Sequence, residues 1–249
     1  MRLLFLNPNT STSMAETMAA EARRIAAPGT QIDVHSAGFG SSYISTRSEA
    51  AVAGHALLSS IAAHYDGHDA IIVGAFIIPA VSQAAKEFAP VPLIATGEAG
   101  LATAQLLGPR FSILSIGAPA RKMTFELVEA LGQLPRLASI RDMGVSGTDL
   151  VDRQQAADDT AVALALDAIE TDLADVIVLG AGSMEGMADR IRDRIPVPVV
   201  SPVASAVIMA EGLVRMGHRK PTAGAFAGPE GIAMTGLDPA LSSFFSRRD

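Results

Sequence analysis

The sequence predicts an α/β fold of two pseudo-symmetric lobes, each a four-stranded parallel sheet flanked by helices, with a ligand cleft between the lobes. Two observations carry this prediction. Short apolar, β-branched runs alternate with alanine-rich stretches of helical spacing, a pattern typical of βαβ units and parallel sheets. The chain also repeats itself, since residues 69–95 align with 175–201 without a gap and the segment from Arg2 aligns more loosely with the segment from Arg110. A duplicated four-strand unit accounts for both.

Each predicted strand is a short run of apolar residues, and each predicted helix is a longer stretch in which apolar residues recur at helical spacing. The strands are expected at 3–6, 31–36, 70–74, 91–95, 111–115, 136–143, 176–180 and 197–201. The helices are expected at 11–26, 48–64, 80–88, 119–132, 150–172, 184–194 and 203–216. Thr10, Ser11 and Ser13 are the candidate N-caps of the first helix because their hydroxyls can accept from free backbone N–H groups.

The division between the lobes follows from the repeat. The first lobe is predicted to comprise residues 1–97 plus about 207–249, and the second lobe residues 98–206. The tail belongs with the first lobe in this prediction because it lies beyond the last strand of the second repeat. A pseudo-twofold relation would place the loops at 74–79 and 180–186 on opposite sides of one cleft, so that a single ligand is contacted from two faces.

Composition narrows the class of protein. The chain has 249 residues, 49% of them hydrophobic and 18% charged, with a net charge of -7. These values indicate a globular, mildly acidic protein, and they argue against a nucleic-acid partner. The apolar runs fall well short of the ~20 residues that a membrane span needs. The N-terminal apolar run ends in a turn and does not resemble a signal peptide, so we expect no membrane contact and a cytoplasmic location.

The chain contains no cysteine, which excludes disulfides, thiolate metal sites and cysteine nucleophiles. The segment HYDGHD at 64–69 matches no standard metal-binding spacing and is interpreted as a charged turn. We therefore expect no metal and no cofactor, and we expect a small molecule as the partner.

The strongest candidate site lies at the ends of two corresponding strands, where open parallel sheets bind ligands. Gly74 ends one strand, and Gly180, followed shortly by Gly182, ends its repeat; their backbone N–H groups are candidate donors to a developing oxyanion. The residues that directly follow Gly74 and Gly180 are Ala75 and Ala181, whose side chains are only methyl groups.

Several polar residues are further candidates. Asn9 and Thr10, in the first strand-to-helix turn, can hold a carbonyl or carboxylate at a helix N-terminus, although caps and turns use the same residues. Ser115 and Ser183 are expected to orient a ligand or cap a helix rather than to attack one, because no histidine lies in a motif with them. Glu185 is expected in a solvated first helical turn.

Six segments together resemble the aspartate/glutamate racemase superfamily, and within it the hydantoin and allantoin racemase branch. They are LNPNTSTSM, DAIIVGAF, VPLIATGEAG, RFSIL, DVIVLGAGSM and VPVVSPVASAV. The resemblance implies a cofactor-independent enzyme, which we expect to form a homo-oligomer, in which two cysteines act as base and acid on opposite faces of an acidic carbon. Ala75 and Ala181 occupy these two catalytic positions here, and Glu98 in TGEAG matches a glutamate of the family. Glu98 could act as a general base if burial raised its pKa.

Two further departures from the family change the expected ligand contacts. The family usually has Gly-Asp-Pro after the phenylalanine, whereas Phe76 is followed here by Ile77, Ile78 and Pro79, so a carboxylate is lost. The family usually has Ser-Ile-Glu where this chain has Ser42, Tyr43 and Ile44, with Arg47 just beyond. Arg47 can contact an anionic substrate group in a bidentate manner, or it can be an exposed residue at a helix start. The contact candidates on this basis are Tyr43, Arg47 and Phe76.

Three functions remain open from the sequence. The first is a racemase-type enzyme of cyclic ureides, imides or related carboxylated compounds, with both cysteines replaced or naturally absent. In this form two-thiol racemisation is not expected, because alanine carries no transferable proton. The second is a hydrolase or decarboxylase on the same scaffold that uses a carboxylate or water. The third is a noncatalytic small-molecule binder.

Overall fold

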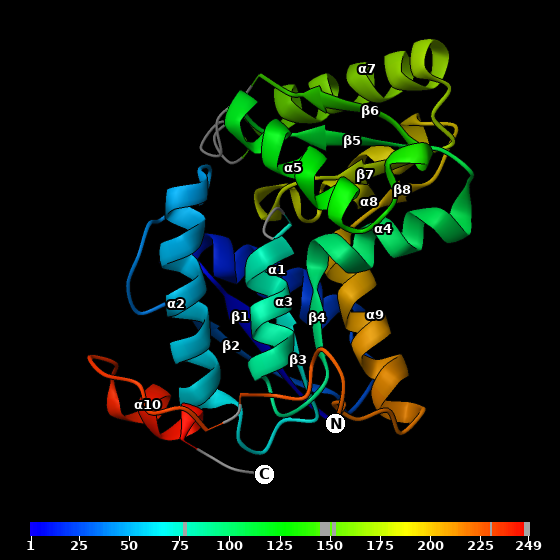
Figure 1. The fold of residues 1–249 in the computed structure, drawn as a ribbon. Helices are drawn as coiled ribbons and strands as arrows, with labels where there is room; N and C mark the ends of the chain where they lie inside the picture. Colours follow the sequence, from blue (N-terminus) through cyan, green and yellow to red (C-terminus); the bar gives the residue numbers. More distant parts are fainter. Residues whose placement is uncertain (77–78, 145–149, 151–152, 230, 247–249) are drawn as a thin grey trace.

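The computed structural model describes residues 1–76, 79–144, 150, 153–229 and 231–246, and shows two four-stranded parallel sheets flanked by helices (Figure 1). The strand orders are β2-β1-β3-β4 and β6-β5-β7-β8, so the second sheet repeats the topology of the first. The first sheet comprises β1 (Arg2–Asn7), β2 (Gln31–Ser36), β3 (Ala70–Val73) and β4 (Leu93–Ala95). The second comprises β5 (Phe111–Ser115), β6 (Leu137–Asp142), β7 (Val176–Leu179) and β8 (Val199–Val200). The predicted fold class is confirmed.

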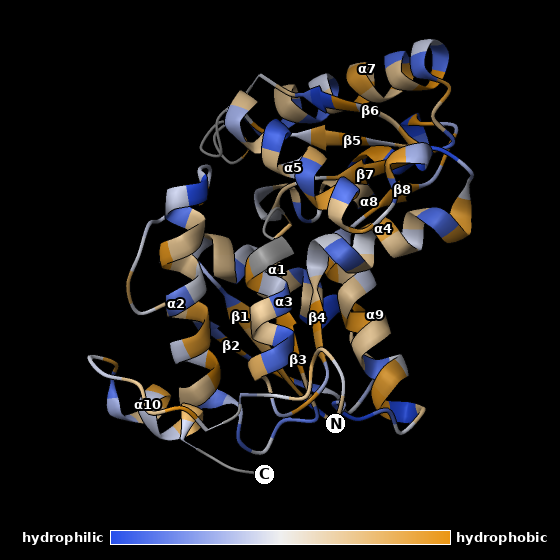
Figure 2. Ribbon diagram, viewed as in Figure 1, coloured by the Kyte–Doolittle hydropathy of each residue, from blue (hydrophilic) through white to orange (hydrophobic). Residues whose placement is uncertain are grey.

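Apart from Arg2 at the start of β1, the central strands of both sheets are buried, as expected for parallel strands covered by helices on both faces. Ala70–Val73 of β3 and Val176–Leu179 of β7 contain only buried residues. Figure 2 shows the apolar residues concentrated on the strands and on the helix surfaces that face them. Each sheet thus has its own core, and the site lies where strand ends of the two sheets come together.

Five helices surround the first sheet. They are α1 (Thr12–Ile25), α2 (Arg47–His64), α3 (Pro79–Phe88), α9 (Pro202–Arg215) and α10 (Pro239–Phe245). Ser11 is the N-cap of α1, with its hydroxyl accepting from the Met14 N–H, as one of the three candidates predicted. Helix α9 packs against α1 and β3, and α10 packs against α2. The segments after the second repeat therefore contact the first sheet, while the exact division of the chain between lobes stays a prediction.

Helices α5 (Ala118–Ala130), α7 (Gln154–Asp172) and α8 (Met187–Ile191) flank the second sheet. The helix predicted at 184–194 is shorter and interrupted, because Gly186 has a φ of 77° and ends the preceding turn. Helix α7 begins within the predicted range 150–172, of which residues 151–152 lie outside the described residues. Within the part of the chain that the structure describes, no helix is both long enough and apolar enough to cross a membrane.

Helix α4 (Thr96–Leu107) was not predicted, and it connects the two sheets. It packs along α9 and against β7, so it lies between the lobes in Figure 1. Its first turn contains Gly97, where an added Cβ would lie 2.3 Å from the Phe76 carbonyl oxygen. The glycines that weaken the helical pattern of this segment are therefore needed for close packing.

Candidate functional site

Gly74 and Gly180 follow β3 and β7 at equivalent positions, and both bring backbones into close contact. The Gly74 N–H donates to the Leu6 carbonyl and the Gly180 N–H to the Leu114 carbonyl, each at 2.8 Å. An added Cβ at Gly180 would lie 2.7 Å from the Leu114 carbonyl oxygen. Both N–H groups already extend the sheet hydrogen bonding, so neither is a free donor to an oxyanion in this structure, and the predicted donor role of Gly182, which lines the pocket, stays a prediction.

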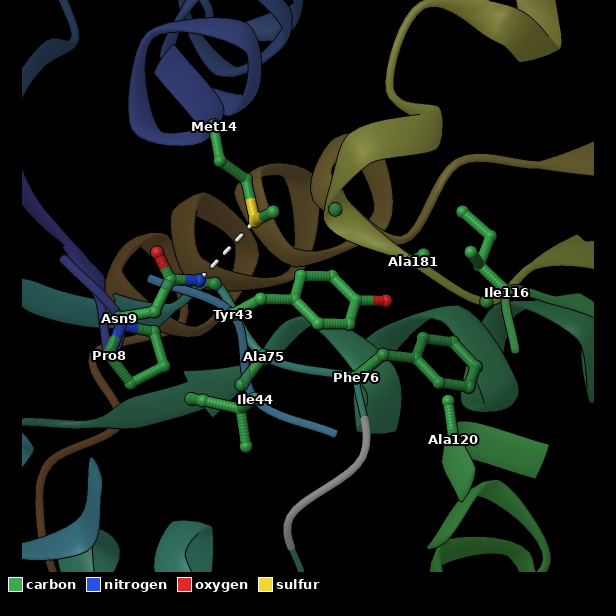
Figure 3. Close-up of a pocket in the computed structure, with 13 residues that line it drawn as sticks. Pro8, Asn9, Met14, Tyr43, Ile44, Ala75, Phe76, Ile116, Ala120 and Ala181 are labelled. Carbon is green, nitrogen blue, oxygen red and sulfur yellow. Dashed lines mark hydrogen bonds between the residues drawn. The ribbon is translucent and has the colours of Figure 1, made fainter. Parts of the chain in front are cut away.

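Past these glycines, residues of both repeats enclose one pocket of about 50 Å³ (Figure 3). The lining residues come from the strand ends and first turns of both lobes. They are Pro8, Asn9, Met14, Tyr43, Ile44, Gly74, Ala75, Phe76, Ile116, Ala120, Gly180, Ala181 and Gly182. A water molecule needs about 10–15 Å³ of such space, so the pocket suits a small, compact ligand.

Ala75 and Ala181 both line this pocket, one from each repeat. Their side chains are partly buried and end in methyl groups, so neither offers a proton donor or acceptor. Figure 3 shows the Tyr43 ring extending across the pocket, with its hydroxyl toward the side of Ala181 and Ile116. The structure thus brings together the two positions that the repeat predicted.

Asn9 is buried, and its side-chain amide has a fixed orientation. Its Oδ1 accepts from Asn7 Nδ2 and from the Ser11 N–H, both at 2.9 Å, so a flipped amide would oppose these donors. Its Nδ2 contacts only the Met14 sulfur, at 3.3 Å, among the described residues (Figure 3). Because a thioether is a weak acceptor, this amide group remains available to a ligand oxygen.

Tyr43 supplies the second polar group of the pocket lining. Burial, and to a lesser extent the nearby Asp142 carboxylate, raises the pKa of its phenol above the ordinary value of 10.0. The hydroxyl is therefore neutral near pH 7 and can donate a hydrogen bond. It makes no hydrogen bond to any residue in the described part of the chain, so its capacity is open to a ligand.

Two charged candidates lie outside the pocket lining. Glu98 forms an ion pair with Lys86 and lines a small neighbouring cavity that shares Ala75 and Phe76 with the pocket. Arg47 forms an ion pair with Glu126 of α5 and lines a neighbouring hollow. Neither side chain is among the described residues that line the pocket, and the predicted roles of Glu98 and Arg47 stay predictions.

Three hydroxyl candidates also lie outside the lining. Ser115 is fully buried and donates to the Arg141 carbonyl at 3.4 Å. The Thr10 N–H donates to the Ser41 carbonyl at 3.0 Å. The Ser183 hydroxyl is buried without a hydrogen-bond partner among the described residues, and it does not cap α8, whose N-cap is Gly186.

Among the described residues, sequence reasoning missed five that line the pocket, which are Pro8, Met14, Ile44, Ile116 and Ala120. Ile116 could have been found, because it follows β5 at a strand end just as Ala75 follows β3. Met14 and Ala120 lie in first helical turns, and an apolar residue there gives no signal that separates a pocket wall from core packing.

Glu185 differs from its prediction as a solvated residue, because the structure buries its carboxyl group between the loop after β7, α1 and the start of α9. Burial raises its pKa from 4.5 to about 8, and the charge of Glu21 adds to this effect. Ser201 Oγ donates to Glu185 Oε2 at 2.7 Å. Glu185 lies behind the loop and does not line the pocket.

No group of three or more His, Asp or Glu side chains that could hold a metal ion occurs among residues whose positions are described. In the HYDGHD segment, the His68 ring contacts the Asp33 carboxylate, with Nε2 and Oδ2 2.9 Å apart. The polar groups facing the pocket are therefore the Asn9 amide and the Tyr43 phenol, which can bind oxygen atoms of a neutral or anionic organic ligand.

The fold and the pocket define a class of two-lobed α/β proteins with a small pocket between duplicated units. Within that class the chain belongs to the Asp/Glu/hydantoin racemase family, whose profile matches residues 3–210. It is 32% identical over 231 residues to a hydantoin racemase of Paenarthrobacter aurescens, covering 92% of this chain and 98% of the relative. It is 26% identical to a hydantoin racemase of Pseudomonas sp. (strain NS671), covering 88% of each chain.

Solved structures agree with this assignment. Allantoin racemase from Pseudomonas fluorescens superposes with a TM-score of 0.91 at 33% identity, covering 95% of this chain and all (100%) of that chain. Allantoin racemase from Klebsiella pneumoniae gives the same TM-score of 0.91 at 31% identity, covering 97% and 99%. Arylmalonate decarboxylase, at 18% identity and a TM-score of 0.62, covering 89% and 96%, shares the fold. These comparisons do not favour the hydrolase, decarboxylase or binder alternatives.

Proposed function

We propose that the pocket binds a small cyclic ureide, imide or related carboxylated compound, and that this form of the chain does not racemise it with two thiols. One observation carries the proposal: Ala75 and Ala181, one from each repeat, line a single small pocket with Asn9 and Tyr43. Hydantoin and allantoin, which name the relatives, are both five-membered cyclic ureides. Such rings present carbonyl oxygens that can accept from the Asn9 amide and the Tyr43 hydroxyl.

The lining of the pocket also supports the second part of the proposal, that this form of the chain does not racemise the ligand with two thiols. Racemisation removes a proton from one face of a carbon and returns one to the other face, so it needs a titratable group on each side. The methyl groups of Ala75 and Ala181 cannot serve. Tyr43 is a single group, and its raised pKa keeps it protonated near pH 7. These residues support binding of the ring in the pocket, but they do not supply a proton-transfer group on each side of it.

Replacing Asn9 with Asp tests the recognition. Aspartate keeps the Oδ1 that accepts from Asn7 and Ser11 but replaces the donating Nδ2 with an oxygen. We expect 5-methylhydantoin to bind the unmodified protein saturably in isothermal titration calorimetry. It should bind Asn9→Asp at least about tenfold more weakly, because the hydrogen bond is lost and an aspartate oxygen then faces the ligand oxygen without a proton between them. Melting temperatures measured in parallel separate a binding defect from unfolding. Absence of saturable binding to the unmodified protein would contradict the proposed function.

Tyr43→Phe removes only the hydroxyl and keeps the ring that spans the pocket. Because this hydroxyl makes no hydrogen bond to the described residues, the variant should fold with an unchanged melting temperature. We expect its affinity for 5-methylhydantoin to fall about three- to tenfold, the usual value of one neutral hydrogen bond. Tyr65→Phe is the control elsewhere in the chain, and equal affinities of Tyr43→Phe and the unmodified protein would remove Tyr43 from the contacts.

A further inference from the structure

A second hollow, of about 310 Å³, lies beside the ligand pocket between the first turns of α2 and α5. Thr46 and Arg47 line it from the first lobe, and Ala118 and Lys122 line it from the second. The two cavities adjoin through the chain itself, because Ile44 and Ala120 line the pocket while Ser45 and Pro119, their sequence neighbours, line the hollow. The hollow and the pocket therefore lie next to each other along these two stretches of the chain.

The described residues that line the hollow include two cations and no carboxylate. Arg47 and Lys122 are its two cations. Glu126, one turn beyond Lys122, pairs with Arg47, and the Glu49 carboxylate accepts from the Ser45 and Thr46 N–H groups in the capping box of α2. Lys122 forms no ion pair with any residue for which the structure gives a position. One cation of the hollow is thus left for an anion from outside the chain.

The ion pair of Arg47 with Glu126 shows which kind of anion fits. The Arg47 guanidinium already holds a carboxylate at the rim of the hollow, in a contact between the two lobes. A ligand carboxylate entering the hollow can accept from Lys122 and compete with Glu126 for Arg47. Hydrogen bonds between ionised partners are stronger than neutral ones, although exposure to solvent reduces the gain.

We propose that this hollow binds a carboxylate substituent of the ligand whose ring occupies the pocket. The ligand is then a cyclic ureide or imide that carries a negatively charged side group. This inference rests on the proposed function of the pocket and specifies its substrate class. It assigns Arg47 and Lys122 as residues that determine specificity, with Glu126 as an internal competitor.

Two probes of the same size test the inference by isothermal titration calorimetry: hydantoin-5-acetic acid and its neutral amide, hydantoin-5-acetamide. The unmodified protein should bind the acid about fivefold more tightly than the amide, the size expected of partly exposed charge pairs. Lys122→Met and Arg47→Met should each reduce this ratio toward one, because each lowers the affinity for the acid more than the affinity for the amide. Glu126→Gln should increase the ratio, because it frees Arg47.

Arg121→Met is the matched control, since it removes the same charge from the neighbouring position of α5 without altering the residues that line the hollow. Its acid-to-amide ratio should equal that of the unmodified protein. A ratio that falls equally in Arg121→Met and Lys122→Met would show a general charge effect and overturn the inference. Equal binding of the two probes by the unmodified protein would overturn it while leaving the proposed function intact. Failure of both probes to bind would overturn the proposed function and this inference together.

Discussion

Ala75→Cys combined with Ala181→Cys is expected to give this protein hydantoin racemisation, an activity that the unmodified chain should lack. Both positions line the same pocket and come from corresponding strand ends of the two repeats. Two thiols there would supply the base on one face of the ring carbon and the acid on the other. Because acid–base groups typically contribute about 10²–10⁴-fold in rate, the double variant should exceed the unmodified protein at least about 100-fold.

The measurement is the loss of optical rotation of one enantiomer of a 5-substituted hydantoin, followed together with exchange of its ring C–H in heavy water. Each single variant is a control, because one thiol serves only one face and should not interconvert the enantiomers. A second control, Ala102→Cys with Ala130→Cys, places two thiols outside the residues that line the pocket. If the Ala75→Cys, Ala181→Cys protein folds and binds hydantoin without racemising it, these two positions are not the acid and base sites.

Glu185→Gln is expected to stabilise the protein above pH 8. Burial raises the pKa of Glu185 from 4.5 to about 8, so the folded state holds a proton that the unfolded state has released. Between these two values the unfolded state binds fewer protons, and the free energy of unfolding therefore falls as pH rises. The slope attributable to this group approaches about 1.4 kcal/mol per pH unit. Glutamine has the shape of the neutral acid and cannot ionise, so this contribution to the slope should disappear.

The surroundings of Glu185 make the expected effect specific. Glu21 of α1, which pairs with Arg24, lies beside it, and Ser201 at the start of α9 bridges the two carboxyl groups at 2.7 and 3.4 Å. Arg24 also pairs with Asp189 at 2.7 Å. Urea unfolding at intervals from pH 5 to pH 9.5 should show the difference between Glu185→Gln and the unmodified protein growing up to about pH 8 and levelling off at higher pH. The exposed Glu129→Gln is the matched control and should follow the unmodified curve; a pH-independent difference for Glu185→Gln would contradict burial of an ionisable group.

The fold was predictable because its signals are local and repeated. Alternating apolar runs and helical stretches located the strands, and the gapless repeat related β3 to β7. Helix α4 escaped prediction because Gly97 and Gly100 weaken its helical pattern, and the reason for these glycines lies in distant residues, the Phe76 carbonyl and Pro202. A helix whose glycines serve tertiary packing gives a poor local signal.

Site residues that lie near the ends of strands could be predicted from the sequence. The hydrogen-bond and ion-pair partners of the charged side chains could not. Ala75, Ala181 and Asn9 follow strand ends or begin a helix, and the structure places all three in one pocket. Arg47 and Glu98 were candidates by residue type, but Glu126 and Lys86 pair with them from other helices. Glu185 follows a glycine loop and has the composition of a solvated turn, yet α1 covers it, and no local rule indicates that contact.

The packing of α4 along α9 has a mechanical consequence. The chain passes from the first sheet to the second through α4 and returns after β8 into α9, so both crossings run along one edge of the molecule. The two covalent connections between the sheets therefore lie together at one edge, whereas α2 and α5 are joined only by non-covalent contacts such as the Arg47–Glu126 ion pair.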